Sequence, residues 1–193
     1  MNIFKKVFIF VGPPGCGKST IGKIVQTKMN ITHISVGDAM RLEISTHSKL
    51  GKKLETYVNK GILVDNHLTN KVLMNRISQD DCSKGFILDG YPRSLHQLKD
   101  FNNILENINA KCFGVICFQI DESTIMTRLS NRTDQRPDDS PDIHQQRYKH
   151  YIEETSQLIE IFRNRGLVYD IDANNGIEEV SSSVLSIITK LIN

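Results

Sequence analysis

Residues 12–19 read Gly-Pro-Pro-Gly-Cys-Gly-Lys-Ser, a complete G-x-x-x-x-G-K-[S/T] phosphate loop. An apolar run, Val7–Val11, precedes the loop, and a helix-like stretch, Ile21–Lys28, follows it. This order of strand, loop and helix is the context that the motif requires. Glycines let backbone N–H groups point inward at a phosphate, and the start of a helix adds partial positive charge. The segment predicts a nucleoside triphosphate site in which Lys18 reaches the phosphates and Ser19 meets Mg²⁺.

The bulk composition is that of an ordinary globular protein. The chain has 193 residues and a formal net charge of +2, which fits one compact domain and shows no polybasic patch for nucleic acid. Its four cysteines form no C-x-x-C pair, so no zinc site is predicted. No stretch reaches the roughly 20 apolar residues of a membrane span, and the first apolar segment is too short for a signal peptide. We expect a cytoplasmic protein that binds neither nucleic acid nor membrane, and we expect a monomer.

Short apolar segments alternate with helical ones along the chain. The predicted strands are Lys6–Val11, His33–Ser35, Phe86–Leu88, Phe113–Ile120 and Leu167–Ile171. The predicted helices are Ile21–Lys28, Asp38–Ser45, Lys49–Asn59, Asp65–Gln79, Leu95–Asn107, Glu122–Leu129, Pro141–Arg163 and Glu178–Leu191, with Ser140 capping the long one. This alternation predicts an α/β fold of the phosphate-loop NTPase type, with helices on both faces of a parallel sheet. Ligands then bind at the carboxyl ends of the strands.

Two segments look inserted between the sheet elements. Residues 37–64 offer two helices without a strand, which predicts a small separate lobe. Residues 131–141 are polar and carry both signs of charge, which predicts a short lid over the phosphate site. The core then comprises residues 1–36, 65–130 and 142–193.

Acidic and basic residues follow the later strands. Asp89 ends the apolar segment Phe86–Leu88, where phosphate-loop enzymes place an acid that holds Mg²⁺, although a turn residue is the plain alternative. Arg93 and Gln97 are four apart and share a helix face, so one of them can meet a phosphate and the other a base edge. Four further arginines occupy one stretch of twenty residues, and planar guanidinium groups suit the neutralisation of several phosphates. They are Arg128, Arg132, Arg136 and Arg147.

In this order, the motifs resemble those of the adenylate kinase family within the nucleoside monophosphate kinases. Asp89-Gly90-Tyr91-Pro92-Arg93 is the most specific match. The other matching segments are Gly12–Thr20, Ser35–Arg41, Gly61–Val64, the arginines and acids from Arg128 to Arg147, and Ala173–Gly176. The absence of zinc-type cysteines and the short lid resemble the short-lid type.

The resemblance implies reversible, Mg²⁺-dependent phosphoryl transfer from ATP to AMP, giving two ADP. It implies ATP contacts from Gly12, Pro13, Pro14, Gly15, Cys16, Gly17, Lys18, Ser19, Thr20, Arg128, Arg132 and Gly176. It implies AMP contacts from Val36, Gly37, Arg41, Leu63, Val64, Gly90, Arg93, Gln97, Arg136 and Arg147. The implied catalytic residues are Lys18, Asp89, Arg93, Arg128, Arg136 and Arg147, with Ser19 and Asp89 on Mg²⁺, partly through water. Asp138 and Asp139 would belong to the lid, unless they only cap the helix that follows.

Two residues depart from the family pattern. Ser19 stands where the family often has glycine, and Val36 stands where adenylate kinases usually carry threonine. Val36 leaves a UMP/CMP kinase open as an alternative, whereas Gln97 favours adenine. Gly-Lys-Ser-Thr-Ile-Gly at 17–22 also suggests a shikimate kinase, which does not account for Asp89–Arg93. A nucleotide-binding protein without turnover is the alternative from another class, and the complete arginine set argues against it.

Overall fold

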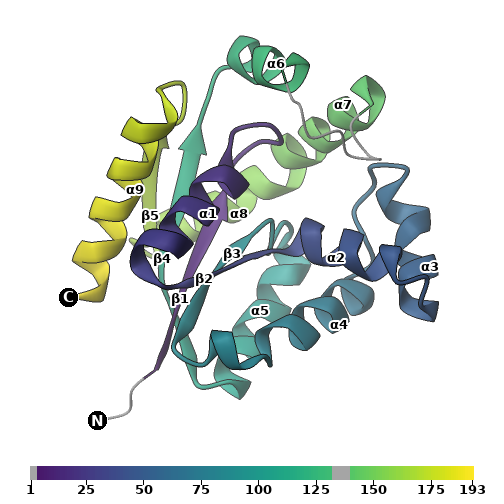
Figure 1. The fold of residues 1–193 in the computed structure, drawn as a ribbon, viewed down its shortest axis with the longest axis horizontal. Coiled ribbons are helices and arrows are strands. Elements are labelled where there is room, and N and C mark those ends of the chain that lie inside the picture. The colour runs from purple at the N-terminus through teal and green to yellow at the C-terminus, as the bar shows by residue number, and fades with distance from the viewer. Residues whose placement is uncertain (1–3, 132–139) are drawn as a thin grey trace.

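The structure, a computed structural model, describes residues 4–131 and 140–193. Strands and helices alternate along the chain as predicted (Figure 1). In order they are β1 (Lys5–Val11), α1 (Lys18–Met29), β2 (Thr32–Ser35), α2 (Val36–Ser45), α3 (Lys49–Val58), α4 (Asn66–Ile77), the 3₁₀ turn η1 (Asp80–Cys82), β3 (Gly85–Asp89), α5 (Leu95–Asn107), β4 (Ala110–Gln119), α6 (Glu122–Ser130), α7 (Pro141–His150), the π turn η2 (Tyr151–Thr155), α8 (Ser156–Asn164), β5 (Val168–Asp172) and α9 (Ile177–Ile192). Within the described ranges, no helix combines the length and apolar character needed to cross a membrane.

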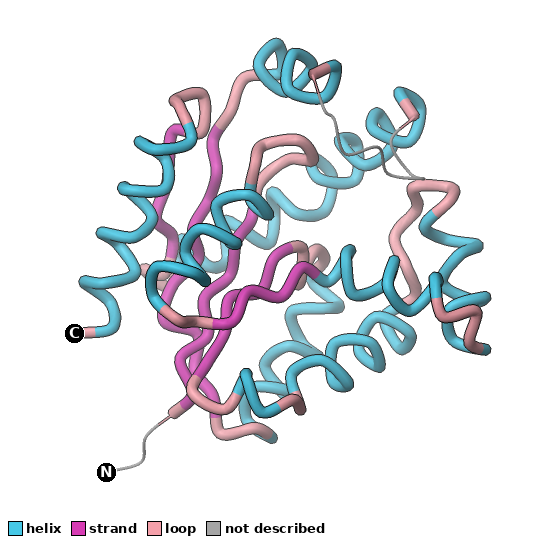
Figure 2. The backbone as a smooth tube through the Cα atoms, viewed as in Figure 1, coloured by secondary structure: helices cyan, strands magenta, loops and turns pink. Residues whose placement is uncertain are grey.

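The described strands form one parallel sheet in the order β2-β3-β1-β4-β5, drawn in magenta in Figure 2. β1 is central, and Val7–Val11 are almost inaccessible to solvent, as is the whole of β3. Burial on both faces is the reason that these strands are continuous apolar runs in the sequence. The chain leaves β1 towards one edge of the sheet and leaves β4 towards the other. A crevice at their carboxyl ends is therefore the expected ligand site.

Alternate residues of β1 pack into two separate cores. Val7, Ile9 and Val11 pack with residues from α4, α5 and α8, whereas Phe8 and Phe10 pack with residues from α1 and α9. Because successive side chains of a strand point to opposite faces, the two clusters lie on opposite sides of the sheet. The predicted α/β fold with both faces covered is confirmed.

The long helix predicted over Pro141–Arg163 is interrupted. Its start is as expected, because the Ser140 hydroxyl accepts a hydrogen bond from the Ile143 N–H at 3.4 Å. The π turn η2 then separates α7 from α8. The buried positions of this stretch come after α7, at Thr155 in η2 and at Leu158, Ile159 and Phe162 in α8, while α7 buries no residue. The first half of this helix therefore extends away from the core.

The inserted segment that contains α2 and α3 lies beyond the β2 edge of the sheet (Figure 1). It carries no strand in the described structure, as the sequence predicted. At its far end Gly61 has a φ of +65°, and a Cβ there would come within 2.7 Å of the Ile143 side chain on α7. This end of the segment therefore packs directly against α7. That the segment is a separate lobe remains a prediction.

Candidate active site

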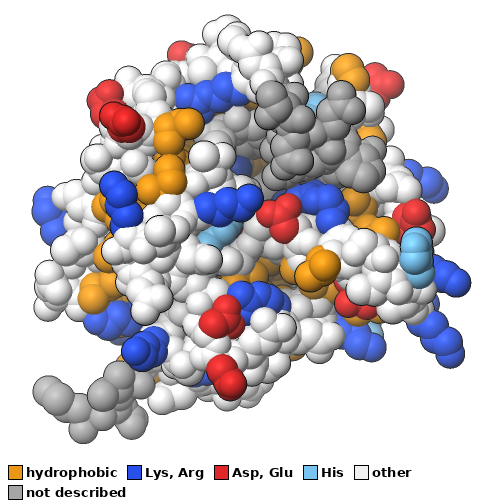
Figure 3. All heavy atoms as spheres, in the orientation of Figure 1, with side chains coloured by type: hydrophobic (Ala, Val, Ile, Leu, Met, Phe, Trp, Pro, Cys, Tyr) orange, Lys and Arg blue, Asp and Glu red, His pale blue; other side chains and the backbone are white. Residues whose placement is uncertain are grey.

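One cleft of about 670 Å³ opens at the carboxyl ends of the strands. The phosphate loop and α1 form one wall, and α2 with Gly61–Val64 forms the other. Parts of α7, η2 and the segment Asp89–Arg93 lie between these walls. On the face shown in Figure 3, basic side chains flank the central hollow, with an acidic side chain between them. A cleft with these walls can hold an extended anionic ligand.

The phosphate loop joins the end of β1 to the start of α1. Gly15 and Gly17 have φ values of +86° and +96°, which side chains other than glycine rarely adopt. Gly17 is also the N-cap of α1 and supplies no side-chain hydrogen bond, so the first N–H groups of the helix are left to a ligand. A Cβ on Gly12 would lie only 2.9 Å from the Phe118 carbonyl oxygen, so the loop packs tightly on β4. The loop is a preformed anion cradle.

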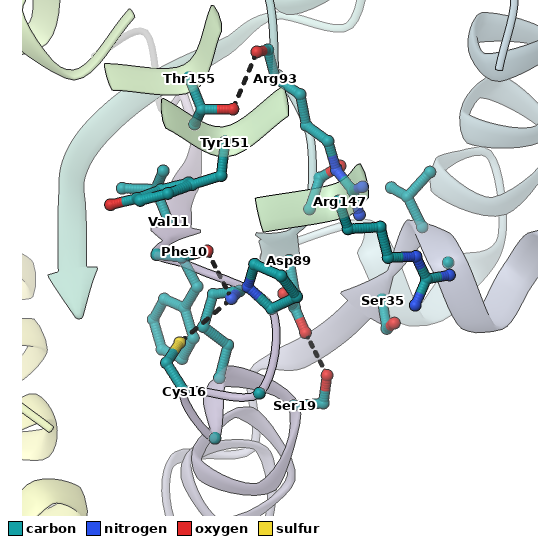
Figure 4. Close-up of a pocket in the computed structure, with 18 of the residues that line it drawn as sticks. Phe10, Val11, Cys16, Ser19, Ser35, Asp89, Arg93, Arg147, Tyr151 and Thr155 are labelled. Carbon is teal, nitrogen blue, oxygen red and sulfur yellow. Dashed lines mark hydrogen bonds between the residues drawn. The ribbon is translucent and has the colours of Figure 1, made fainter. Parts of the chain in front are cut away.

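The Lys18 ammonium group lies inside the loop itself. It donates hydrogen bonds to the carbonyl oxygens of Gly12 and Pro13, at 2.8 and 2.9 Å. The Cys16 sulfur lies 3.1 Å from the same nitrogen, and Figure 4 shows this contact as a dashed line. A cation is therefore held where the phosphates of a nucleotide would enter.

Asp89 ends β3 and is 4 % exposed. The Ser19 hydroxyl donates a hydrogen bond of 2.6 Å to Asp89 Oδ2 (Figure 4). Burial raises the pKa of this carboxyl, but His33, the charge of Lys18 and the Ser19 hydroxyl together hold the pKa below its ordinary value. The carboxylate is therefore ionised at neutral pH. Its hydrogen-bond partner is the hydroxyl of Ser19, the residue that the phosphate-loop motif predicts to bind Mg²⁺.

His33 was not predicted to belong to the site. Its Nε2 atom is buried 3.4 Å from Asp89 Oδ2, and it makes no well-aligned hydrogen bond with the described residues. We therefore regard this contact as mainly electrostatic. Gly22 makes room for the ring, because a Cβ there would come within 2.3 Å of it. The pairing of β2 with β3, in which His33 lies opposite Ile87, brings the imidazole to this place.

The opposite wall of the cleft begins where β2 passes directly into α2. Ser35 caps this helix by accepting the Asp38 N–H at 3.2 Å. Arg41, one turn on, forms an ion pair with Asp38 and lines the cleft. Val36 is 3 % exposed and contributes an apolar surface. The other members of this wall predicted from the sequence, Gly37, Leu63 and Val64, also line the cleft.

Arg93 follows a cis peptide bond between Tyr91 and Pro92, and its backbone is fixed by several contacts. Its N–H donates to Gln97 Oε1 at 2.8 Å, and its Nε donates to the Gly90 carbonyl at 2.8 Å. The pKa of Arg93 is lowered, mainly because the surrounding protein atoms replace water around the guanidinium group. The negative charge of Asp89 raises this pKa, and the positive charge of Arg41 lowers it further. The side chain still opens into the solvent of the cleft, so the guanidinium remains a cation.

Arg128 on α6 joins two loops on the phosphate-loop side. Its guanidinium donates to the carbonyl oxygens of Cys16 and Asn175, both at 3.1 Å. Asn175 lines the cleft, whereas Gly176, the predicted contact, is not among the lining residues. The structure thus places Arg128 beside the phosphate loop and the segment before α9. A role at the transferred group remains a prediction.

Arg147 on α7 also lines the cleft, and Figure 4 shows its side chain extending into the same pocket as that of Arg93. The remaining predicted residues, Arg132, Arg136, Asp138 and Asp139, lie outside the described residues. Their roles, and the assignment of residues 131–141 as a lid, remain predictions. The cleft does bring together the described arginines that the sequence singled out: Arg41 from α2, Arg93 from the segment between β3 and α5, Arg128 from α6 and Arg147 from α7.

Besides His33, which contacts Asp89 but is not among the lining residues, sequence reasoning missed several residues that line the cleft. Tyr151, Glu154 and Thr155 come from the π turn, and Met40 and Ile177 come from α2 and α9. In the sequence, Tyr151 and Thr155 fall at the helical spacing of a packing face, and only their place next to the site distinguishes them. No local signal in the sequence marks the π turn.

The fold and the cleft together define a nucleotide-binding α/β protein of the phosphate-loop class. The family model described as "Adenylate kinase" matches residues 10–167. An adenylate kinase of Fervidobacterium nodosum is 39 % identical, with 93 % of this chain and 96 % of that protein covered. Those of Thermobifida fusca and Archaeoglobus fulgidus are 36 % and 34 % identical, over 92 % and 95 % of this chain and 95 % and 98 % of theirs. The chain belongs to the adenylate kinase family.

Proposed function

We propose that this protein transfers a phosphoryl group reversibly from Mg²⁺-bound ATP to AMP, giving two ADP. One observation carries the proposal: a single cleft has the phosphate loop on one wall and a second apolar and basic wall opposite, with Arg93 and Arg147 between them. Phosphoryl transfer needs two nucleotides in line and the neutralisation of charge on the transferred group. Membership of the adenylate kinase family supports the same reaction.

The ATP side is the phosphate-loop wall. The loop N–H groups and Lys18 hold the phosphates, and Arg128 holds the loop to the Asn175 segment on which the base would lie. The monophosphate side is the opposite wall, where Arg41 and Arg93 hold the phosphate. Arg147 reaches the space between the two sides. In this proposal, residues 37–64 form the lobe that binds the acceptor.

The residues around Ser19 and Asp89 fit a magnesium ion. Mg²⁺ takes oxygen ligands and is usually bound by one or two carboxylates together with substrate phosphates and water. The structure offers one such carboxylate beside a hydroxyl, and no cluster of three acidic, histidine or cysteine ligands occurs among the described residues. Ser19 and Asp89 would hold the ion, partly through water. Bound Mg²⁺ would neutralise part of the charge of the ATP phosphates.

Gln97 supports adenine as the acceptor base. The Arg93 N–H is a donor, so the side-chain atom that it meets must be the amide oxygen of Gln97. The NH₂ group is then left to donate towards the cleft that Gln97 lines. Adenine offers an acceptor at N1 of its pairing edge, whereas guanine and uracil present N–H donors there. The amide therefore suits AMP and opposes GMP and UMP, although cytosine also offers an acceptor.

A steady-state assay with Mg·ATP and each of AMP, UMP, CMP and GMP tests the proposal. We expect AMP to have the highest kcat/KM, by more than about tenfold over GMP and UMP, because the N–H groups of those two bases meet the committed amide donor of Gln97. A preference of the same size for a pyrimidine would overturn the choice of acceptor. Tight nucleotide binding without turnover of any monophosphate would overturn the enzymatic proposal itself.

A further inference from the structure

The π turn at Tyr151–Thr155 lies where the long helix passes the cleft. The sequence there, Tyr-Ile-Glu-Glu-Thr, contains neither proline nor glycine, so composition does not explain the irregularity. An extra residue in a helix rotates the following side chains by about 100° relative to a regular helix. The turn thus allows α8 to pack on the core while Arg147 of α7 lines the cleft.

Thr155 is the last residue of this turn, and it is 6 % exposed. A threonine in a helix commonly donates its hydroxyl to the carbonyl four residues earlier. Thr27 on α1 and Thr127 on α6 do this, bonding to Lys23 and Ser123. The Thr155 hydroxyl instead donates to the Arg93 carbonyl oxygen at 3.0 Å, 62 residues away in the sequence (Figure 4).

This bond completes a clamp on the Arg93 peptide groups. The N–H of Arg93 is held by Gln97 on α5, and its carbonyl is held by Thr155 on η2. The guanidinium group is in turn anchored through its Nε to the Gly90 carbonyl. A side chain with four rotatable bonds is aimed most accurately when its own backbone cannot move. The clamp therefore fixes the starting point from which Arg93 enters the cleft.

We propose that Thr155 is a positioning residue for Arg93, because its hydroxyl is committed to the Arg93 carbonyl oxygen and holds it from the π turn. This inference rests on the proposed function, because it takes Arg93 to hold the phosphate of the acceptor. Thr155 then governs the acceptor side of the cleft and leaves the ATP side unaffected. Through Thr155, the π turn also connects the backbone of Arg93 to α7, the helix that carries Arg147.

The test compares Thr155→Val with Thr155→Ser and with the control Thr27→Val. Valine keeps the shape of threonine and removes the hydroxyl, so we expect KM for AMP to rise about tenfold, the size of one neutral hydrogen bond. We expect KM for ATP and the values for Thr27→Val to stay within about twofold, and Thr155→Ser to restore most of the affinity. Thermal unfolding midpoints establish that each variant is folded. If the valine variant does not fold, Thr155→Ala takes its place.

A double-mutant cycle separates positioning from general damage. In an Arg93→Ala background, we expect Thr155→Val to change KM for AMP by less than about twofold, because the group that it positions is gone. An undiminished tenfold effect there, or equal effects on AMP and ATP in the single variant, would overturn the inference. So would a Thr155→Val enzyme indistinguishable from wild type. Failure of the wild-type protein to phosphorylate AMP would instead refute the proposed function, so the two failures are distinguishable.

Discussion

The substitution Gln97→Glu distinguishes the role of the Gln97 amide oxygen from the role of its NH₂ group. It keeps an oxygen to accept the Arg93 N–H, which the amide now meets at 2.8 Å, and it removes the NH₂ donor. An ionised carboxylate then faces adenine N1, so an acceptor meets an acceptor. The lost hydrogen bond and the unsatisfied atoms cost about 2–3 kcal/mol, or about 30- to 150-fold in kcat/KM for AMP.

The assay is steady-state transfer from Mg·ATP to AMP, GMP and UMP at pH 8.5. Burial raises the pKa of the introduced carboxyl and Arg93 lowers it, so this pH ensures ionisation. We expect AMP to lose its advantage over GMP and UMP, whose N–H groups suit a carboxylate. On lowering the pH through the pKa of the introduced group, the protonated acid regains a donor, and AMP activity recovers in part.

Gln26→Glu is the matched control. Gln26 lies exposed on α1, and its Oε1 accepts the His33 N–H at 2.8 Å, so the same exchange is made away from the cleft. We expect this control to retain wild-type acceptor preference. An equal loss with AMP, GMP and UMP in Gln97→Glu would refute the reasoning, because it would mean that Gln97 only supports Arg93 and does not read the base.

Three further predictions concern charge, metal and backbone. Arg93→Ala is expected to lower kcat on the order of 10³-fold, as loss of an arginine that stabilises transition-state charge does, and Arg93→Lys is expected to restore little of it. Ser19→Ala is expected to raise the Mg²⁺ concentration for half-maximal rate severalfold, while KM for AMP at saturating Mg²⁺ is unchanged. Gly85→Ala is expected to cost about 3 kcal/mol or more in urea denaturation, because its φ is +137° and a Cβ would lie 2.2 Å from the Lys6 carbonyl oxygen. Gly166→Ala, at φ +69° with open space, is expected to cost about 1–2 kcal/mol.

The parts of the fold that the sequence predicted are those governed by local rules. The phosphate loop, the buried strands and the capped helices each carry their own signal, in glycine spacing, apolar runs and residues such as Ser140. The π turn could not be predicted, because what distinguishes Thr155 from an ordinary helical threonine is a bond to Arg93, far away in the sequence. Packing across the fold decides that geometry, and no local pattern encodes it.

The site follows the same division. Lys18, Asp89 and Arg93 were identified from motifs, because their chemistry requires those residue types at that spacing. His33 was not identified, because its place beside Asp89 depends on how β2 pairs with β3 and on the space left by Gly22. Arg128 was identified, but its bonds to Cys16 and Asn175 depend on where α6 packs, which spacing does not reveal.

The hydrogen bonds of Lys18 within its own loop have a consequence for how strongly nucleotides are discriminated. The rotational freedom of this side chain, about 1.5–2 kcal/mol for a lysine, is surrendered when the chain folds and not when a ligand arrives. An incoming phosphate replaces two carbonyl oxygens as the hydrogen-bond acceptor of Lys18. The binding free energy gained is therefore the difference between a hydrogen bond to a charged acceptor and one to a neutral acceptor. Affinity at this loop therefore increases with the negative charge of the ligand, which favours a triphosphate over its shorter relatives.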